Sequence, residues 1–169
     1  AGVGGTPVPA VGGRAGLAAL GRRVPVVQAP NCSVAVNVLV HLVREATRLL
    51  GPGFDAEIVE LHHAAKRDAP SGTALRLAEA VAEARGADLS SCGVYSRQGE
   101  TGARPAGAIG VQALRGGDNP GEHVVMFLGA GERLELAHRA ATRDHFARGA
   151  VRAAAWLAGR PPGLYHMRE

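Results

Sequence analysis

The chain has 169 residues, 46% hydrophobic and 20% charged, a balance typical of a globular protein that excludes a disordered one. Its net charge is +4, but the arginines are scattered singly and aromatic residues make up only 4%. This composition argues against a nucleic-acid surface and suits an anionic small substrate or cofactor. No apolar run approaches the ~20 residues that cross a membrane, and the first residues resemble no secretory signal.

The first part of the chain predicts one α/β unit. Gly and Pro crowd into residues 1–16, which we expect to form loops or broken ends. Residues 24–29 are typical of a short buried strand, which Pro30 ends. Ser33 is expected to cap a helix whose apolar residues recur at helical spacing and which stops at Gly51.

The remaining sequence predicts a mixed α+β domain. Residues 55–62 alternate as a strand does, and Ser71 is expected to cap a helix that ends at Gly86. The segments 99–121 and 159–163 are rich in Gly and Pro and are expected to contain loops. Three further strands and a last helix are predicted at 108–114, 122–128, 132–138 and 144–158. An open sheet leaves edges and a face to cover, so we expect sheet-to-sheet association.

The cysteines predict no metal or disulfide site. Cys32 and Cys92 lack CxxC spacing, so we expect both to be reduced in a cytoplasmic protein. His62 and His63 are neighbours at a strand end and point to opposite sides, which places them poorly for a shared metal. Histidine is better suited to proton donation, and we interpret His62 in that way.

A lysine and a helix start follow the histidines. Lys66 is the only lysine beside eighteen arginines, and its ammonium is a compact, rotatable charge that a guanidinium cannot replace. Ser71 starts a helix at which Gly72 and Thr73 expose first-turn N–H groups suited to a carboxylate. The segment 60–74 therefore predicts a proton donor, a cation and an anion site in one place.

The run ELHHAAKRDAPSGTA, residues 60–74, resembles the signature of the 4-hydroxy-tetrahydrodipicolinate reductase family, E-x-H-H-x-x-K-x-D-x-P-S-G-T-A. The segments APNCSVAVNVL, IGVQALRGGDNPGEHVVMF and GERLELAHRAATRDHFARGAVRAAAWL are similar to the family in the same order, so the resemblance covers nearly the whole chain. The family belongs to the diaminopimelate and lysine pathway. It implies an NADPH- or NADH-dependent oxidoreductase that reduces a cyclic dicarboxylate and forms a homotetramer, with no nucleic-acid or membrane partner.

The resemblance also implies the domains and the roles of residues. The chain would hold the last part of a Rossmann nucleotide-binding domain in residues 1–31, a mixed-sheet substrate and tetramerisation domain in 32–150, and a C-terminal helix and tail in 151–169. His62 would donate the proton, Lys66 would be a catalytic cation or proton donor, and His63, Gly72 and Thr73 would bind the substrate. Nicotinamide contacts would map to Gly5, Thr6, Pro7, Ala29, Pro30, Asn31 and Cys32.

The chain departs from the family at several positions. Pro7 stands where Thr is usual, Cys32 where Phe or Met is common, and His166 where Asp is usual. No G-x-x-G-x-x-G phosphate loop precedes Gly4, so we expect a fragment that lacks most of the nucleotide-binding half. The choice between NADH and NADPH stays open.

The sequence leaves two alternatives open. A catalytically incomplete fragment would fold, oligomerise and bind a dicarboxylate without turnover. A different Rossmann oxidoreductase, such as a homoserine or aspartate dehydrogenase, would share the α/β beginning but supply no HHxxK…PSGT run.

Overall fold

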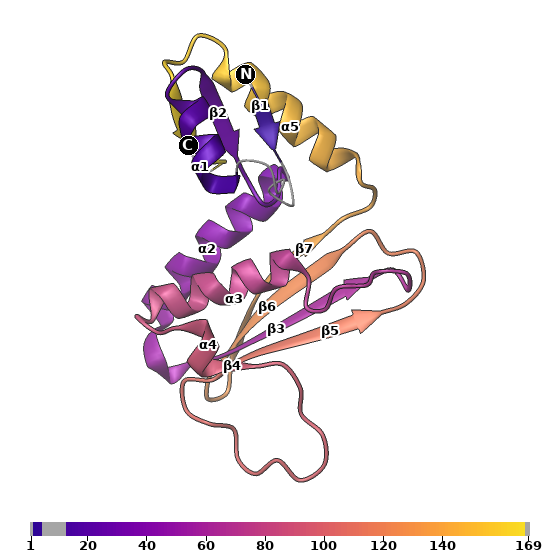
Figure 1. The fold of residues 1–169 in the computed structure, drawn as a ribbon. Helices are drawn as coiled ribbons and strands as arrows, with labels where there is room; N and C mark the ends of the chain where they lie inside the picture. Colours follow the sequence, from indigo (N-terminus) through magenta and orange to yellow (C-terminus); the bar gives the residue numbers. More distant parts are fainter. Residues whose placement is uncertain (1, 5–12, 168–169) are drawn as a thin grey trace. The chain divides into compact units, whose positions relative to one another are not determined.

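The computed structural model describes residues 2–4 and 13–167 (Figure 1). Contacts divide the chain into two compact units. Unit 1 combines Ala1–Val38 with Thr142–Glu169, and unit 2 is Leu39–Ala141. The predicted boundaries at residues 31 and 150 differ from this division, because helix α2 (Val34–Leu50) begins in unit 1 and ends in unit 2, and the whole of the last helix belongs to unit 1.

Unit 1 is a small parallel sheet with two helices. Its strand order is β1-β2-β8, and both strand pairs are parallel. Helix α1 contacts β2 and β8, and α5 contacts β1 and β2. The elements are β1 (Gly2–Gly4), α1 (Gly13–Gly21), β2 (Pro25–Gln28), α5 (Asp144–Leu157) and β8 (Gly163–Tyr165).

The helix α5 packs closely on the loop that follows β2. A Cβ atom added at Gly149 would lie 1.8 Å from the carbonyl oxygen of Cys32, so only glycine permits this approach. Buried Ala153 and Leu157 join Val27 in the small apolar core of the unit. The loop after β2 is therefore held against α5.

Unit 2 is built on a mixed five-stranded sheet in the order β4-β5-β3-β6-β7. The central strand β3 is parallel to β5 and antiparallel to β6. Helix α3 (Gly72–Ala84) crosses one face of this sheet in Figure 1 and contacts β3, β5 and β6. The strands are β3 (Asp55–His62), β4 (Gly93–Val94), β5 (Ile109–Arg115), β6 (Glu122–Leu128) and β7 (Arg133–Arg139).

Alternation along β3 decides which residues enter the core. Its even-numbered residues are buried, as expected of a strand with one face against helices. Ala56 and Ile58 join the apolar core with Leu77 and Val81 of α3, whereas Glu60 and His62 occupy the same face nearer the strand end. The two polar residues are therefore core-facing residues of a largely apolar strand.

The other face of β3 anchors the long segment 95–108. Glu57 accepts hydrogen bonds from Arg97 at 2.8 and 3.0 Å and from Arg104 at 2.9 Å. Gly110 of the neighbouring strand makes room, because a Cβ atom there would lie 1.7 Å from Oε2 of Glu57. The mutual pairing of one half-buried carboxylate with two arginines fixes this loop to the sheet.

The fold class agrees with the prediction, an α/β part followed by a mixed sheet with helices. All predicted strands and helices are present, with ends close to those expected. The expectation of loops at residues 1–16 and 159–163 was wrong in part, because α1 begins at Gly13, Gly2–Gly4 form β1 and β8 begins at Gly163. The short helix α4 (Leu89–Cys92) and strand β4 were not predicted.

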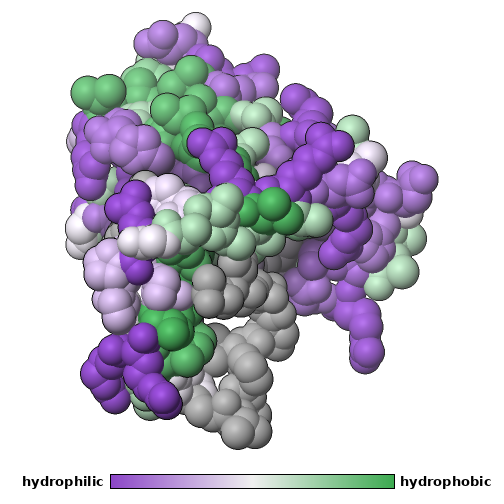
Figure 2. Space-filling view, turned by 90° about the horizontal axis from the view of Figure 1, so that it is seen from above, coloured by the Kyte–Doolittle hydropathy of each residue, from purple (hydrophilic) through white to green (hydrophobic). Residues whose placement is uncertain are grey.

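The surface is mixed in character. Figure 2 shows a face on which hydrophilic residues alternate with smaller hydrophobic areas. Among the described helices, none is long and apolar enough to span a bilayer.

Candidate active site

The site is centred on the end of β3, where Glu60 and His62 point to the same side of the strand. The Nδ1 atom of His62 lies 2.5 Å from Oε2 of Glu60. Glu60 is fully buried and His62 is 9% exposed. Burial lowers the pKa of His62 and outweighs the opposite effect of Glu60, while the charges of Lys66 and Arg115 lower it further.

Arg115 pairs with Glu60 through both of its terminal nitrogens. Nη1 donates to Oε2 at 2.8 Å and Nη2 to Oε1 at 2.9 Å. The register of the sheet places Arg115 directly beside His62 on the parallel strand β5. Burial alone would raise the pKa of Glu60, but hydrogen bonds from Arg115, His62 and the backbone of Ser71 outweigh it and hold this pKa below its ordinary value.

The start of α3 meets the same carboxylate. The backbone N–H of Ser71 donates to Oε1 of Glu60 at 3.0 Å, and Oγ of Ser71 accepts a hydrogen bond from the N–H of Ala74 at 3.1 Å. Ser71 is therefore the N-cap that the sequence predicted. Gly72 and Thr73 form the first turn, and a Cβ atom added at Gly72 would meet no heavy atom within 4 Å. The described protein atoms thus leave open space beside this turn.

His123 lies on β6, opposite Glu60 in the register. Its Nε2 atom is 3.0 Å from Oγ of Ser71, and its ring centroid is 5.2 Å from that of His62. Burial, assisted by the nearby His62, lowers the pKa of His123 to about 3. His123 is therefore neutral at ordinary pH.

The loop that carries His63 and Lys66 is tied to the turn before β6. The N–H of His63 donates to the carbonyl of Asn119 at 2.8 Å, and the N–H of Gly116 donates to the carbonyl of His62 at 3.0 Å. The N–H of Lys66 closes a local turn onto His63 at 3.1 Å. His63 is half-buried and lies outside β3, so the two histidines occupy different environments.

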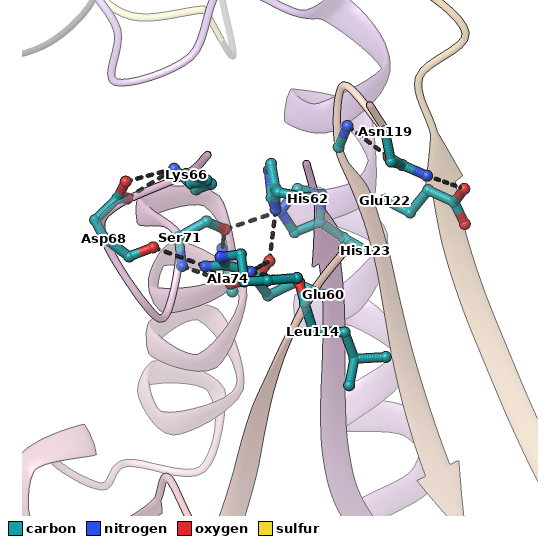
Figure 3. A network of polar contacts seen from close by, with 12 residues as sticks. Glu60, His62, Lys66, Asp68, Ser71, Ala74, Leu114, Asn119, Glu122 and His123 are labelled. Carbon is teal, nitrogen blue, oxygen red and sulfur yellow. Dashed lines mark hydrogen bonds and ion pairs between the residues drawn. The ribbon is translucent and has the colours of Figure 1, made fainter. Parts of the chain in front are cut away.

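Lys66 is oriented by an acidic neighbour. Its Nζ atom donates to both carboxylate oxygens of Asp68, at 2.7 and 2.8 Å. The hydrogen bond from Lys66 lowers the pKa of Asp68. Figure 3 shows this pair beside the start of α3, with His62 and His123 nearby. The ammonium therefore belongs to the same region as the histidine and the helix start.

Gly121 leaves room for the imidazole of His62. A Cβ atom at this position would lie 2.8 Å from Nε2 of His62, and the φ angle of +144° also favours glycine. The N–H of Gly121 donates to Oδ1 of Asn119 at 2.8 Å, which holds the glycine in place. The position of His62 thus depends on the backbone just before β6 as well as on its own strand.

The predicted cofactor residues lie partly in the described loop of unit 1. Ala29 and Cys32 are buried, Pro30 is exposed, and Asn31 accepts a hydrogen bond from the N–H of Ser33 at 2.8 Å. Burial raises the pKa of the Cys32 thiol. The loop follows the carboxyl end of β2 in a parallel sheet, the place where such sheets bind ligands, so its position fits a nicotinamide cofactor. The other predicted contacts, Gly5, Thr6 and Pro7, lie outside the described residues.

Within unit 2, the structure brings together His62, Lys66 and the Gly72–Thr73 turn. Reasoning from the sequence missed Glu60, Arg115 and His123, and it assigned Ser71 only a capping role. A signal for Glu60 was present, because it is two residues from His62 and therefore on the same strand face. Arg115 and His123 gave none, since their proximity depends on how β5 and β6 pair with β3.

The chain is a two-part α/β protein. One part is a small parallel sheet with helices, and the other is a mixed sheet that carries a histidine beside a helix start. Residues 35–169 match the family described as "Dihydrodipicolinate reductase, C-terminus". The chain belongs to this family.

Several curated relatives are named 4-hydroxy-tetrahydrodipicolinate reductase. The chain is 58% identical to that of Anaeromyxobacter dehalogenans strain 2CP-1, over 92% of this chain and 58% of the relative. It is 57% identical to that of Myxococcus xanthus, over 92% of this chain and 57% of the relative. The chain therefore spans somewhat more than half the length of these relatives.

A solved structure supports the fold. It is titled "Dipicolinate bound Dihydrodipicolinate reductase from Paenisporosarcina sp. TG-14" and aligns with a TM-score of 0.72, at 23% identity, over 97% of this chain and 62% of that chain. At this identity the likeness shows a shared fold.

Proposed function

We propose that this chain is the substrate-binding part of an NAD(P)H-dependent reductase that converts 4-hydroxy-tetrahydrodipicolinate to tetrahydrodipicolinate in the diaminopimelate and lysine pathway. The observation that carries the proposal is the meeting of His62, Lys66 and the start of α3 in unit 2. A proton donor, a cation and an anion-binding helix start would complement the hydride of a nicotinamide cofactor in the reduction of a cyclic dicarboxylate. The names of the relatives support the same reaction.

Each residue has a defined role in this proposal. His62 donates a proton to the carbon next to the one that is reduced, and His63 contacts the substrate. Lys66 and the first-turn N–H groups at Gly72 and Thr73 bind substrate charge, an effect that a water-poor site strengthens. On substrate binding, Lys66 would share its donors between Asp68 and a substrate carboxylate.

The cofactor would be NADPH or NADH, which supplies a hydride when bound. Ala29, Pro30, Asn31 and Cys32 would hold its nicotinamide side, together with Gly5, Thr6 and Pro7. The domain roles follow the same division: the parallel sheet for the cofactor, the mixed sheet for substrate and association into a homotetramer.

The test is calorimetric titration with pyridine-2,6-dicarboxylate, a planar dicarboxylate, at low ionic strength. We expect Lys66→Gln to weaken binding by about tenfold or more, because a charge-assisted hydrogen bond is lost. Arg67→Gln is the matched control, since Arg67 is an exposed neighbour of the same charge. Equal effects of the two substitutions, or no binding by the unsubstituted chain, would contradict the proposal.

The second candidate is a chain that binds the dicarboxylate without turnover. It is favoured by the 58% share of a relative's length that the chain spans. Oxidation of NADPH or NADH in the presence of substrate separates the two: oxidation supports the reductase, and binding without oxidation supports the second candidate for this chain.

A further inference from the structure

We propose that Glu60 is a positioning residue that holds His62 with its Nδ1 protonated, leaving Nε2 to exchange the proton, and that also fixes the helix start that binds the substrate. This inference rests on the proposed function and assigns a role to Glu60, a charged residue that is fully buried at the site. Glu60 itself is not expected to touch the substrate.

The hydrogen bonds assign the charge of Glu60. Its two oxygens face three fixed donors, the backbone N–H of Ser71 and both terminal nitrogens of Arg115, and Oε2 also contacts Nδ1 of His62. The two-point pair with the Arg115 guanidinium favours the ionised carboxyl group, because each oxygen then accepts a hydrogen bond from a cation. Glu60 is therefore a carboxylate, and Nδ1 of His62 is the donor in their contact.

The tautomer follows from that assignment. A neutral imidazole carries one N–H, so donation from Nδ1 leaves Nε2 as the acceptor, and in the imidazolium Nε2 carries the second proton. Gly121 has no side chain, so it leaves Nε2 uncovered. A Cβ atom at this position would lie 2.8 Å from Nε2. Both contacts favour Nε2 as the atom that exchanges a proton.

Burial above all keeps the carboxylate from holding His62 as a permanent cation. Glu60 favours the imidazolium, whereas burial and the positive charges of Lys66 and Arg115 disfavour it. Among the described residues, the neutral ring of His123 also faces His62. The imidazole can therefore be both protonated and deprotonated, as a proton donor that turns over must be.

A structural role alone explains Glu60 poorly. The preceding core-facing residues of β3 are Ala56 and Ile58, and an apolar residue would continue the pattern. A buried ion pair contributes little net stability compared with a well-packed apolar pair. What Glu60 adds is a link between His62 and Ser71, which belong to different elements of the site.

The first test uses the unsubstituted protein. Long-range proton–nitrogen NMR correlations of histidine side chains report which ring nitrogen carries the proton, and a His62→Gln sample identifies the signals of His62 among the seven histidines. At mildly alkaline pH we expect the Nδ1–H tautomer. The Nε2–H tautomer would overturn the inference.

The second test uses Glu60→Asp, which keeps the charge for Arg115 but withdraws the carboxylate from His62. We expect a mixture of tautomers and, in a hydride-transfer assay, a kcat lower by about tenfold or more with a displaced pH profile. Glu57→Asp is the matched control, because Glu57 is also an Arg-paired carboxylate of β3 but lies on the opposite face.

The outcomes separate the two proposals. An unchanged tautomer and pH profile in Glu60→Asp would overturn the positioning role. Failure of the unsubstituted chain to bind pyridine-2,6-dicarboxylate would instead overturn the proposed function, and the tautomer of His62 would still decide the positioning role.

Discussion

Two carboxylates on one strand show how the side of a sheet decides what a residue does. Glu57 lies on the face away from α3 and pairs with Arg97 and Arg104, which fixes a loop. Glu60 lies on the core face and pairs with Arg115 and His62. Glu57 and Glu60 are three positions apart on the strand and therefore lie on opposite faces, so their similar ion pairs serve different purposes.

At Gly121 we expect a substitution to disturb His62 directly. Gly121→Ala should destabilise the protein by about 1–3 kcal/mol and weaken dicarboxylate binding, because the new methyl group collides with the imidazole in a strained backbone. Gly117→Ala is the control, since its φ is also positive but no heavy atom lies within 4 Å of the new Cβ. Urea unfolding and calorimetry measure the two effects. Equal losses in both variants would show that backbone strain alone matters.

At His123 we expect a pH-dependent loss of stability. Its pKa in the folded protein is about 3, below the ordinary value, so the unfolded chain takes up a proton that the folded chain refuses. As pH falls from about 6.5 to about 4.5, this residue should lower the free energy of unfolding by up to roughly 1.4 kcal/mol per pH unit.

Urea unfolding across that pH range checks the prediction. His123→Gln should show a shallower decline than the unsubstituted protein, and His41→Gln, at an exposed position of α2, should not. A parallel decline in all three proteins would contradict it.

At the scale of elements, the spacing of apolar residues predicted the helices and strands that are long enough to show a pattern. The strands 55–62 and 122–128 and the helix capped by Ser71 were predicted correctly. By contrast, β8 has only three residues, which cannot show alternation, and α1 begins and ends with glycine, the residue that disfavours a helix. The site residues within the run 60–74 could be predicted from the sequence. Arg115 could not, because its place in the site depends on the register of two strands that are distant in sequence.

The segment 95–108 should depend on Glu57 of β3, which holds both Arg97 and Arg104, with Asp55 as a second partner of Arg104. Replacing Glu57 with Gln removes the charge that Arg97 and Arg104 share, and we expect faster hydrogen–deuterium exchange throughout this segment with little change in β6. Glu79→Gln, at an exposed position of α3, is the control. Unchanged exchange in the segment would mean that other contacts hold it.

At the scale of the whole molecule, one face of the mixed sheet lacks a helix among the described residues of unit 2. This open face carries Val59, Val124 and Met126, which are half-buried, and Leu114, which is 51% exposed. Apolar residues on such a face favour association between copies of the chain, as the proposed homotetramer requires.

Charge on the open face should reduce that association. Met126→Lys places an ammonium where apolar contact is expected, so sedimentation should show a shift toward the 17.3 kDa mass of a single chain. Glu79→Lys, on the exposed side of α3, should leave the mass unchanged. If the mass of Met126→Lys does not fall, the subunits associate through another surface.

The division into units also sets an order of events during synthesis. Unit 2 is one continuous stretch, so it can fold as soon as residue 141 has left the ribosome. Unit 1 must wait, because β2 pairs with β8 and Pro25 finds its partner only at Gly163. Unit 1 joins two segments that are separated in sequence by the whole of unit 2. Once unit 2 has folded, it is a shorter connection than an unfolded chain, which lowers the entropy cost of bringing the two segments together. The nascent chain should thus complete its mixed sheet before its parallel sheet.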